Sequence, residues 1–111
     1  MSYASIDPQI RDWAAKHALK LFTSWADHAA RFIYVSSVTG DCFQIWIDPP
    51  EAGQVSLHAA FVDGPRDEDL NWDCHVPESD LASALEQTFS KVTDWMKPSE
   101  RYYPDPSEVQ R

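Results

Sequence analysis

Apolar and polar residues alternate with a period of two through the middle of this 111-residue chain. The alternating runs are 42–48, 54–62 and 70–76, and a run rich in β-branched and aromatic residues, 31–38, precedes them. Because successive side chains of a strand point to opposite faces, each run predicts a β-strand. The runs are joined by short segments that contain Gly or Pro, which favour turns between antiparallel neighbours. The pattern therefore predicts a four-stranded antiparallel meander.

A helix is predicted before the first strand. Asp7 and Pro8 are typical of a helix start, since the Asp side chain can accept from the free amides of the first turn and Pro loses no hydrogen bond there. Apolar residues then recur at spacings of three and four, which predicts a helix that runs to Asp27 or His28 and lies on a core. The stripe consists of Ile10, Trp13, Ala14, His17, Ala18, Leu21, Phe22 and Trp25. Its Trp residues are interpreted as core, and His17 is interpreted as a core-edge residue bonded to backbone.

A second helix is predicted over residues 77–96, and Pro98 ends it. Its apolar positions Leu81, Leu85, Phe89, Val92 and Met96 step by four, four, three and four. The predicted fold is a single α+β domain over residues 1–98, in the order α-β-β-β-β-α. Residues 99–111 contain Pro104 and Pro106 and are expected to form an extended tail.

Period two also separates the two faces of the predicted sheet, of which one is expected to carry both helices and the other to meet water. The apolar face would consist of Phe43, Ile45, Ile47, Val55, Leu57, Ala59, Phe61, Leu70, Trp72, Cys74 and Val76. The open face would show Gln44, Trp46, Asp48, Ser56, His58, Ala60, Asn71, Asp73 and His75. For the run 31–38 the pattern leaves the assignment open, because apolar residues occur at both parities.

Negative charge is concentrated in one part of the chain. Residues 41–86 hold eleven carboxylates and one cation, Arg66, whereas the two flanks together are nearly neutral and the whole chain carries −9. Such a charge repels nucleic-acid phosphate and anionic membrane surfaces, so neither is expected as a partner. A basic protein is the natural candidate, because complementary charge accelerates encounter and suppresses wrong partners.

Compartment and chemistry give mostly exclusions. The first residues lack the cationic and apolar stretches of a secretory signal, and the two cysteines, Cys42 and Cys74, lack a CxxC spacing, so reduced thiols and a cytoplasmic location are expected. No GxSxG, HExxH, GxxxxGK[ST] or GxGxxG motif occurs, which predicts no enzyme and no nucleotide site by those routes. Cys74 and His75 point to opposite faces of a strand, and DGPRDED at residues 63–69 lacks the turn Gly of a calcium loop, so no metal or cofactor is expected.

Trp46 is the apolar residue that the alternation places on the open face, between Gln44 and Asp48. Trp carries much of the energy of protein interfaces, and a Trp framed by carboxylates and histidines has the composition of a binding hot spot, unless the C-terminal tail covers it. The candidate partner-binding residues are Trp46, Asp48, His58, Asp63, Asp67, Glu68, Asp69, Asp73 and His75.

Three hypotheses follow for the function. In size, α/β composition and concentrated negative charge, the chain resembles the class of bacterial immunity proteins, which includes barstar and the colicin immunity proteins, although it matches no family motif. That resemblance implies an inhibitor that neutralises a basic toxin or effector domain. The second hypothesis is a secretion-type chaperone that binds a client segment, and such chaperones typically have a helix between strands. The third is a small enzyme that uses carboxylates, His58 or His75 on the open face.

Overall fold

The computed structural model describes residues 2–66 and 68–97 of the chain. Its elements are α1 (Asp7–Lys16), β1 (Phe22–Trp25), β2 (His28–Ser36), β3 (Cys42–Ile47), β4 (Gln54–Asp63), β5 (Asn71–Pro77), the 3-10 turn η1 (Glu78–Asp80) and α2 (Leu81–Met96). The predicted tail, residues 99–111, lies outside the described residues. Over residues 2–66 and 68–97, no helix has the length and apolar character needed to cross a membrane.

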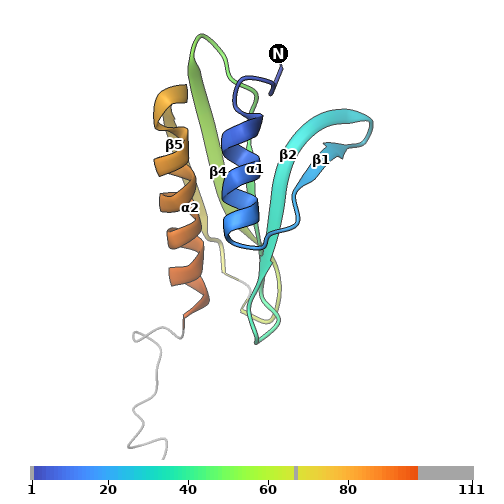
Figure 1. Cartoon of the computed structure of the whole chain (residues 1–111). Helices are drawn as coiled ribbons and strands as arrows, with labels where there is room; N and C mark the ends of the chain where they lie inside the picture. The colour runs from blue at the N-terminus through green and yellow to red at the C-terminus, as the bar shows by residue number, and fades with distance from the viewer. Residues whose placement is uncertain (1, 67, 98–111) are drawn as a thin grey trace, which may run out of the picture.

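The five strands form one antiparallel sheet in the order β1-β2-β3-β4-β5. The α+β class and the meander connectivity are therefore confirmed, but the predicted number of four strands is wrong. Both helices lie against the same face of the sheet, and the β1–β2 hairpin stands out from the body beside them (Figure 1). The bounds of the four predicted strands differ from the observed ones by three residues at most.

The additional strand, β1, occupies the second half of the segment predicted as one long helix. The chain leaves α1 through Ala18, which has a φ of +54°, while the amide of Leu19 donates to the carbonyl of Ala14 at 2.8 Å. This closure satisfies a helix-end carbonyl in the way that a C-terminal Gly normally permits. The two residues between β1 and β2, Ala26 and Asp27, both have positive φ, as a type I′ hairpin turn requires.

The loss of the predicted long helix changes the position of Trp25. This side chain was predicted to lie in the core, but it is 64% exposed at the end of β1. Phe22 and Trp25 keep the three-residue spacing of a helix, yet Thr23 and the two aromatic residues also favour a strand. Pairing with β2 gives this segment its backbone hydrogen bonds.

The core fills the space between the sheet and the two helices. The predicted apolar face is confirmed, because its β3 and β4 residues through Ala59 are essentially inaccessible and its remaining members are partly buried against the core. On β2, whose faces the sequence left open, Ile33 and Val35 point toward the helices. From the helices come Ile10, Trp13, Ala14, Leu81, Ala84, Leu85, Val92 and Trp95.

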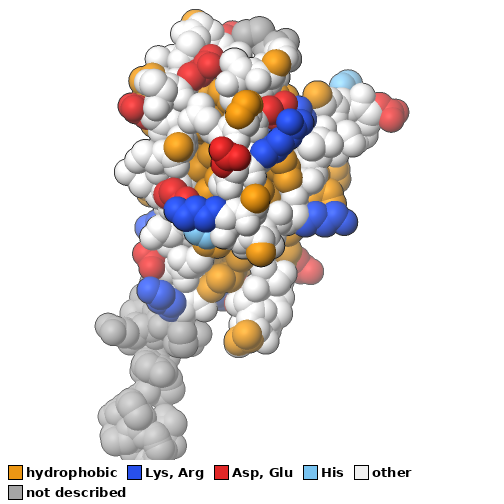
Figure 2. All heavy atoms as spheres, in the orientation of Figure 1, with side chains coloured by type: hydrophobic (Ala, Val, Ile, Leu, Met, Phe, Trp, Pro, Cys, Tyr) orange, Lys and Arg blue, Asp and Glu red, His pale blue; other side chains and the backbone are white. Residues whose placement is uncertain are grey.

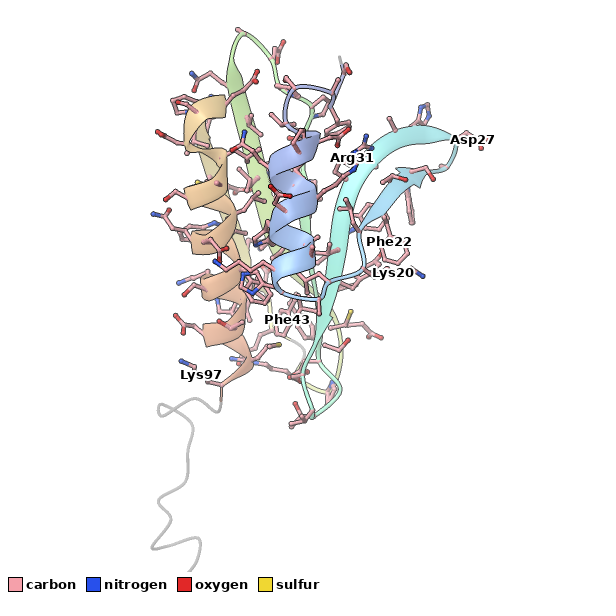
Figure 3. The ribbon with its side chains drawn as sticks, viewed as in Figure 1. Lys20, Phe22, Asp27, Arg31, Phe43 and Lys97 are labelled. Carbon is pink, nitrogen blue, oxygen red and sulfur yellow. The ribbon has the colours of Figure 1, made fainter. Side chains whose placement is uncertain are left out.

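The hairpin is attached to α1 by one charged side chain, Arg31 of β2. Its Nε and Nη2 donate to the two carboxylate oxygens of Asp7 at 2.7 and 3.0 Å, and its Nη1 donates to the carbonyls of Thr23 and Ala30 at 3.1 and 2.6 Å. The guanidinium also lies 4.3 Å from the ring centroid of Tyr3. Figure 3 shows Arg31 on the side of the hairpin that faces α1. Asp7 and Arg31 thus join the helix start to both strands of the hairpin.

We expect Asp7→Asn to lower the free energy of unfolding by about 2 kcal/mol at pH 7, because both side chains are only 13% exposed and a charge-assisted pair is lost. The hydrogen bond from Arg31 holds the pKa of Asp7 below its usual range. The stability difference should therefore be complete above the unfolded pKa of about 3.9 and disappear as the pH falls through the lower folded pKa. Urea unfolding between pH 2.5 and 7 measures it. Asp12→Asn on the same helix is the control, and an equal loss there would contradict the prediction.

The loop that follows the C-terminal end of β4 and leads to β5 packs against the buried side chain of Asp41. Asp41 is 5% exposed, and its Oδ1 accepts from the backbone amide of Arg66 at 3.0 Å. Gly64 passes so close that a Cβ there would stand 2.6 Å from the Cα of Asp41, and its φ is +144°. Asp41 therefore has a structural role, and the packing leaves no space for a side chain at position 64.

We expect Gly64→Ala to lower the free energy of unfolding by about 3 kcal/mol, since it adds a backbone clash to an unfavourable φ. Gly53→Ala is the matched control, because Gly53 also has a positive φ, +75°, but has nothing within 4 Å of an added Cβ. That variant should lose about 1 kcal/mol. Urea unfolding of both variants makes the comparison, and equal losses would show that the contact with Asp41 is unimportant.

Candidate functional site

A row of side chains crosses all five strands on the face that the helices leave uncovered. Phe22 pairs with Phe32, Phe32 with Trp46, Trp46 with His58, and His58 with Asp73. Side chains of directly paired residues lie on the same face of a sheet. We call these five residues the open-face row. It changes from aromatic on β1, β2 and β3 to ionisable on β4 and β5.

The aromatic end of the row is ordered by ring contacts. Phe22 stacks on Phe32 with ring centroids 5.0 Å apart and an interplanar angle of 6°. Trp25 and Tyr34 approach the ring of Phe32 edge-on at 6.1 and 5.6 Å. Phe32 is consequently buried although no helix covers it, whereas Trp25 and Tyr34 remain exposed.

Trp46 joins the aromatic end of the row to the ionisable end. Its ring stacks on His58 with centroids 5.0 Å apart and an interplanar angle of 22°. The structure thus confirms that Trp46 points away from the main core, and it shows that the residue is half-buried by its neighbours on the open face. Its paired neighbours are Phe32 on β2 and His58 on β4.

His58 lies between two carboxylates. Its Nδ1 is 2.6 Å from Oδ1 of Asp73, and its Nε2 is 2.8 Å from Oδ2 of Asp48. Both ring nitrogens can donate only when the imidazole is protonated. Partial burial lowers the pKa of His58, but the hydrogen bonds to Asp73 and Asp48 raise it by more, so its pKa lies above the ordinary value. The cluster therefore holds one positive charge between two negative ones when His58 is protonated.

A second histidine, His75, pairs with Ser56 on the same face, and Oγ of Ser56 lies 2.8 Å from Nδ1 of His75. A hollow of about 400 Å³ lies beside them and is lined in part by Asp48 and Glu51. In a nucleophilic dyad the base is oriented by a third group. Among residues 2–66 and 68–97, however, Ser56 is the one hydrogen-bond partner of His75. The exposed Ser56–His75 pair is thus a cross-strand contact without the third, orienting group of a nucleophilic triad among these residues.

The remaining predicted residues lie elsewhere. Asp63 ends β4, five residues beyond His58, which is about 17 Å at the rise of a strand. Glu68 pairs with the guanidinium of Arg66 at 3.2 Å, and Asp69 accepts from Asn71 at 2.9 Å. Asp67 lies outside the described residues. The nine predicted residues therefore do not form one site.

The side chain of Arg66, the single cation of the acidic segment, points toward the C-terminal end of α2 and not toward solvent. Its guanidinium donates to the carbonyl of Trp95 at the end of α2, in addition to its pair with Glu68. The loop between β4 and β5 is thereby attached to α2. This loop has a local structural role that the sequence did not reveal, and its described carboxylates, Glu68 and Asp69, pair with Arg66 and Asn71.

Four aromatic residues of the open face were missed in the sequence: Phe22, Trp25, Phe32 and Tyr34. Phe22 and Trp25 were assigned to a helix, and the parity of Phe32 and Tyr34 could not be decided. For Phe32 and Tyr34 the available signal was their shared parity with Trp46, once the short turn at residues 39–41 is taken to pair the flanking strands.

His17, predicted to bond to backbone at the core edge, instead contacts a side chain. Its Nε2 lies 2.8 Å from Oε1 of Glu86 on α2, and Lys16 lies 3.0 Å from the other oxygen. The hydrogen bond from His17, and to a smaller extent the one from Lys16, holds the pKa of Glu86 below its usual range. This cluster joins the two helices on the face opposite to the open-face row.

Cys42 and Cys74 are both free thiols, and the described part of the chain has no group of His, Cys, Asp and Glu side chains placed to hold a metal ion. The face with the helices carries acidic and basic side chains interspersed (Figure 2). No family model, no curated protein and no solved structure matches this chain.

We expect the contribution of His58 to stability to depend on pH. Because its folded pKa is raised, the stabilisation should be complete below the unfolded pKa of about 6.5 and disappear as the pH rises through the folded pKa. The free energy of unfolding of the wild type should exceed that of His58→Gln by about 1 kcal/mol at pH 5.5, and this difference should shrink by pH 8.5. Urea unfolding measures both proteins, with the exposed His28→Gln as control. A difference that grows with pH would contradict this prediction.

Proposed function

We propose that this chain is a small acidic protein-binding domain that neutralises a basic protein partner, in the manner of bacterial immunity proteins and their toxins. The contact surface is the open face of the sheet. The observation that carries the proposal is the open-face row, in which aromatic rings lead to the Asp48–His58–Asp73 cluster on the face that neither helix covers. Exposed aromatic side chains that gather on one uncovered face of a sheet are typical of an interaction site, which supports this proposal.

The rings of Trp25, Tyr34 and Trp46, at and beside the aromatic end of the row, supply the apolar contact area. Trp and Tyr give large contact areas and are enriched among the residues that carry binding energy. Here the rings of Phe22, Phe32 and Trp46 are already held by their neighbours. Binding would therefore cost little additional side-chain entropy, which favours affinity.

The ionisable end of the row supplies the charge preference. Asp48 and Asp73 are 49% and 76% exposed, so both carboxylates remain accessible to a partner's cations while they hold His58. The cluster lies in the segment that carries the excess negative charge. Complementary charge at such a surface speeds association and disfavours acidic partners.

The chaperone alternative has less support. A helix between strands was the feature expected of such chaperones, whereas the described strands follow one another without an intervening helix. The connections from β1 to β5 are turns and loops. An inhibitor-type binding domain is the alternative that the exposed aromatic and acidic side chains favour.

Affinity capture tests the proposal, with the product of the neighbouring gene as the first candidate and a lysate of the source organism as the second. We expect the immobilised full chain to retain a basic protein at about 50 mM salt and to lose at least about tenfold in affinity at about 500 mM, because salt screens charge. Trp46→Ala combined with Asp73→Asn should abolish retention. Both changes leave the core untouched.

Asp12→Asn is the control for that experiment, because it removes one carboxylate from the opposite side of the molecule. It should retain the partner as wild type does. Equal retention by the Trp46 and Asp73 double variant would exclude the open face as the contact surface. Retention that is indifferent to salt, or of acidic proteins only, would exclude a charge-driven inhibitor.

A further inference from the structure

We propose that a groove at the side of the open face receives an arginine side chain of the partner, with the guanidinium stacked on aromatic rings and paired with Asp48. This inference rests on the proposed function and names the chemical group that the surface recognises. The groove lies between the β1–β2 hairpin and the end of β3. It has a volume of about 490 Å³, and its walls include Trp25, Tyr34 and Trp46.

The groove exists because β2 and β3 separate. Their pairing runs from Ser36 opposite Cys42 to Phe32 opposite Trp46, and beyond Phe32 the strand β2 pairs with β1 alone. The hairpin bends away from the body at this point (Figure 1). Tyr3 partly closes the opening from below, since its hydroxyl donates to the carbonyl of Ile47 at 2.9 Å. The opening is therefore built by ordered backbone on both sides.

Aromatic side chains give the groove its walls. Trp25 and Tyr34 are 64% and 39% exposed, and the ring of Trp46 lies opposite them on β3. Ring faces attract cations, and the planar guanidinium of Arg is the cation that most often stacks on them in proteins. The chain itself has two such contacts nearby, Arg31 over Tyr3 at 4.3 Å and Lys20 over Phe22 at 5.1 Å.

A carboxylate stands at the end of the groove. Oδ2 of Asp48 accepts from His58 at 2.8 Å, whereas its Oδ1 has no hydrogen-bond partner among residues 2–66 and 68–97. A guanidinium can donate to that oxygen while it stacks on a ring. Asp48 also faces the cluster with Asp73, so the local field favours a cation over a neutral or acidic group.

The groove also contains one cation of the chain itself, Arg31, which has to be compensated before another can enter. Asp7 pairs with the guanidinium of Arg31 through both carboxylate oxygens, and the carbonyls of Thr23 and Ala30 accept from its Nη1. Arg31 is thus neutralised on the side that faces α1. With His58 protonated, the charge left for a ligand is the single net negative charge of the Asp48–His58–Asp73 cluster, which Asp48 presents at the end of the groove.

NMR titration of the full-length, ¹⁵N-labelled chain tests this inference with three probes: acetyl-Gly-Arg-Gly-amide, the same peptide with citrulline, and the same peptide with Lys. Citrulline has the size and shape of arginine without its charge. The shifts of the indole N–H signals of Trp25 and Trp46 give the dissociation constant of each peptide. We expect the Arg peptide to bind at least about tenfold more tightly than the citrulline peptide, and more tightly than the Lys peptide. Trp25→Phe and Trp46→Phe assign the signals.

Two variants and a control locate the site. Asp48→Asn and Tyr34→Ala should each weaken the Arg peptide by about fivefold or more, and Asp12→Asn should leave it unchanged. Equal shifts from the citrulline peptide would overturn the role of charge, and equal affinity for the Lys peptide would overturn the preference for arginine. Shifts confined to signals outside the groove would overturn the site.

Two other occupants are separate outcomes that would overturn the proposal. Indole shifts that grow with protein concentration without peptide would show that a second copy fills the groove. Indole shifts on replacing Arg101 and Arg111 by Gln would show that the chain's own C-terminal segment does so. If the peptide fails while partner capture still depends on Trp46 and Asp73, only this inference is wrong. If the peptide binds but no basic protein is captured, the proposed function is wrong instead.

Discussion

The structure depends on the placement of both helices on one face of a five-stranded sheet. The inner face is closed by aliphatic residues and by the apolar stripes of α1 and α2. Among residues 2–66 and 68–97 no helix covers the other face, so its side chains are positioned there by their cross-strand neighbours. Phe32 and His58 show how this is done, since the first is buried by surrounding rings and the second is held by two carboxylates.

Much of the sheet could be predicted because period two is a strong signal where it is uninterrupted. Residues such as Ile45 and Leu57 are where the alternation placed them. The first strand could not be predicted, because the chain turns away from α1 at Ala18 and the hairpin turns at Ala26 and Asp27, all with positive φ at residues that are not Gly. Backbone geometry usually revealed by Gly was here imposed by pairing with β2.

The candidate site could be predicted only in part for a related reason. Trp46, Asp48, His58 and Asp73 were identified from parity, which a sequence displays. The separation of Asp63 and Glu68 from them depends on distance along the strand and on the direction taken by Arg66, which parity does not give. The aromatic partners of Trp46 depend on register between strands. The site is thus a product of strand pairing. The local sequence shows which residues of one strand share a face, but it does not show which residues of neighbouring strands lie side by side.

The short β1 has a consequence for how copies of this chain meet. An uncovered sheet edge with unpaired backbone groups invites another strand, and an aromatic face beside it would add to the attraction. Here the outermost strand has four residues, and its pairing with β2 is interrupted by a register shift between Phe22 and Ser24. The opposite edge, β5, carries exposed Asp73 and ends at Pro77. Both edges of the sheet therefore carry features that disfavour the pairing of one copy's edge strand with another's, although aromatic side chains lie beside one of them.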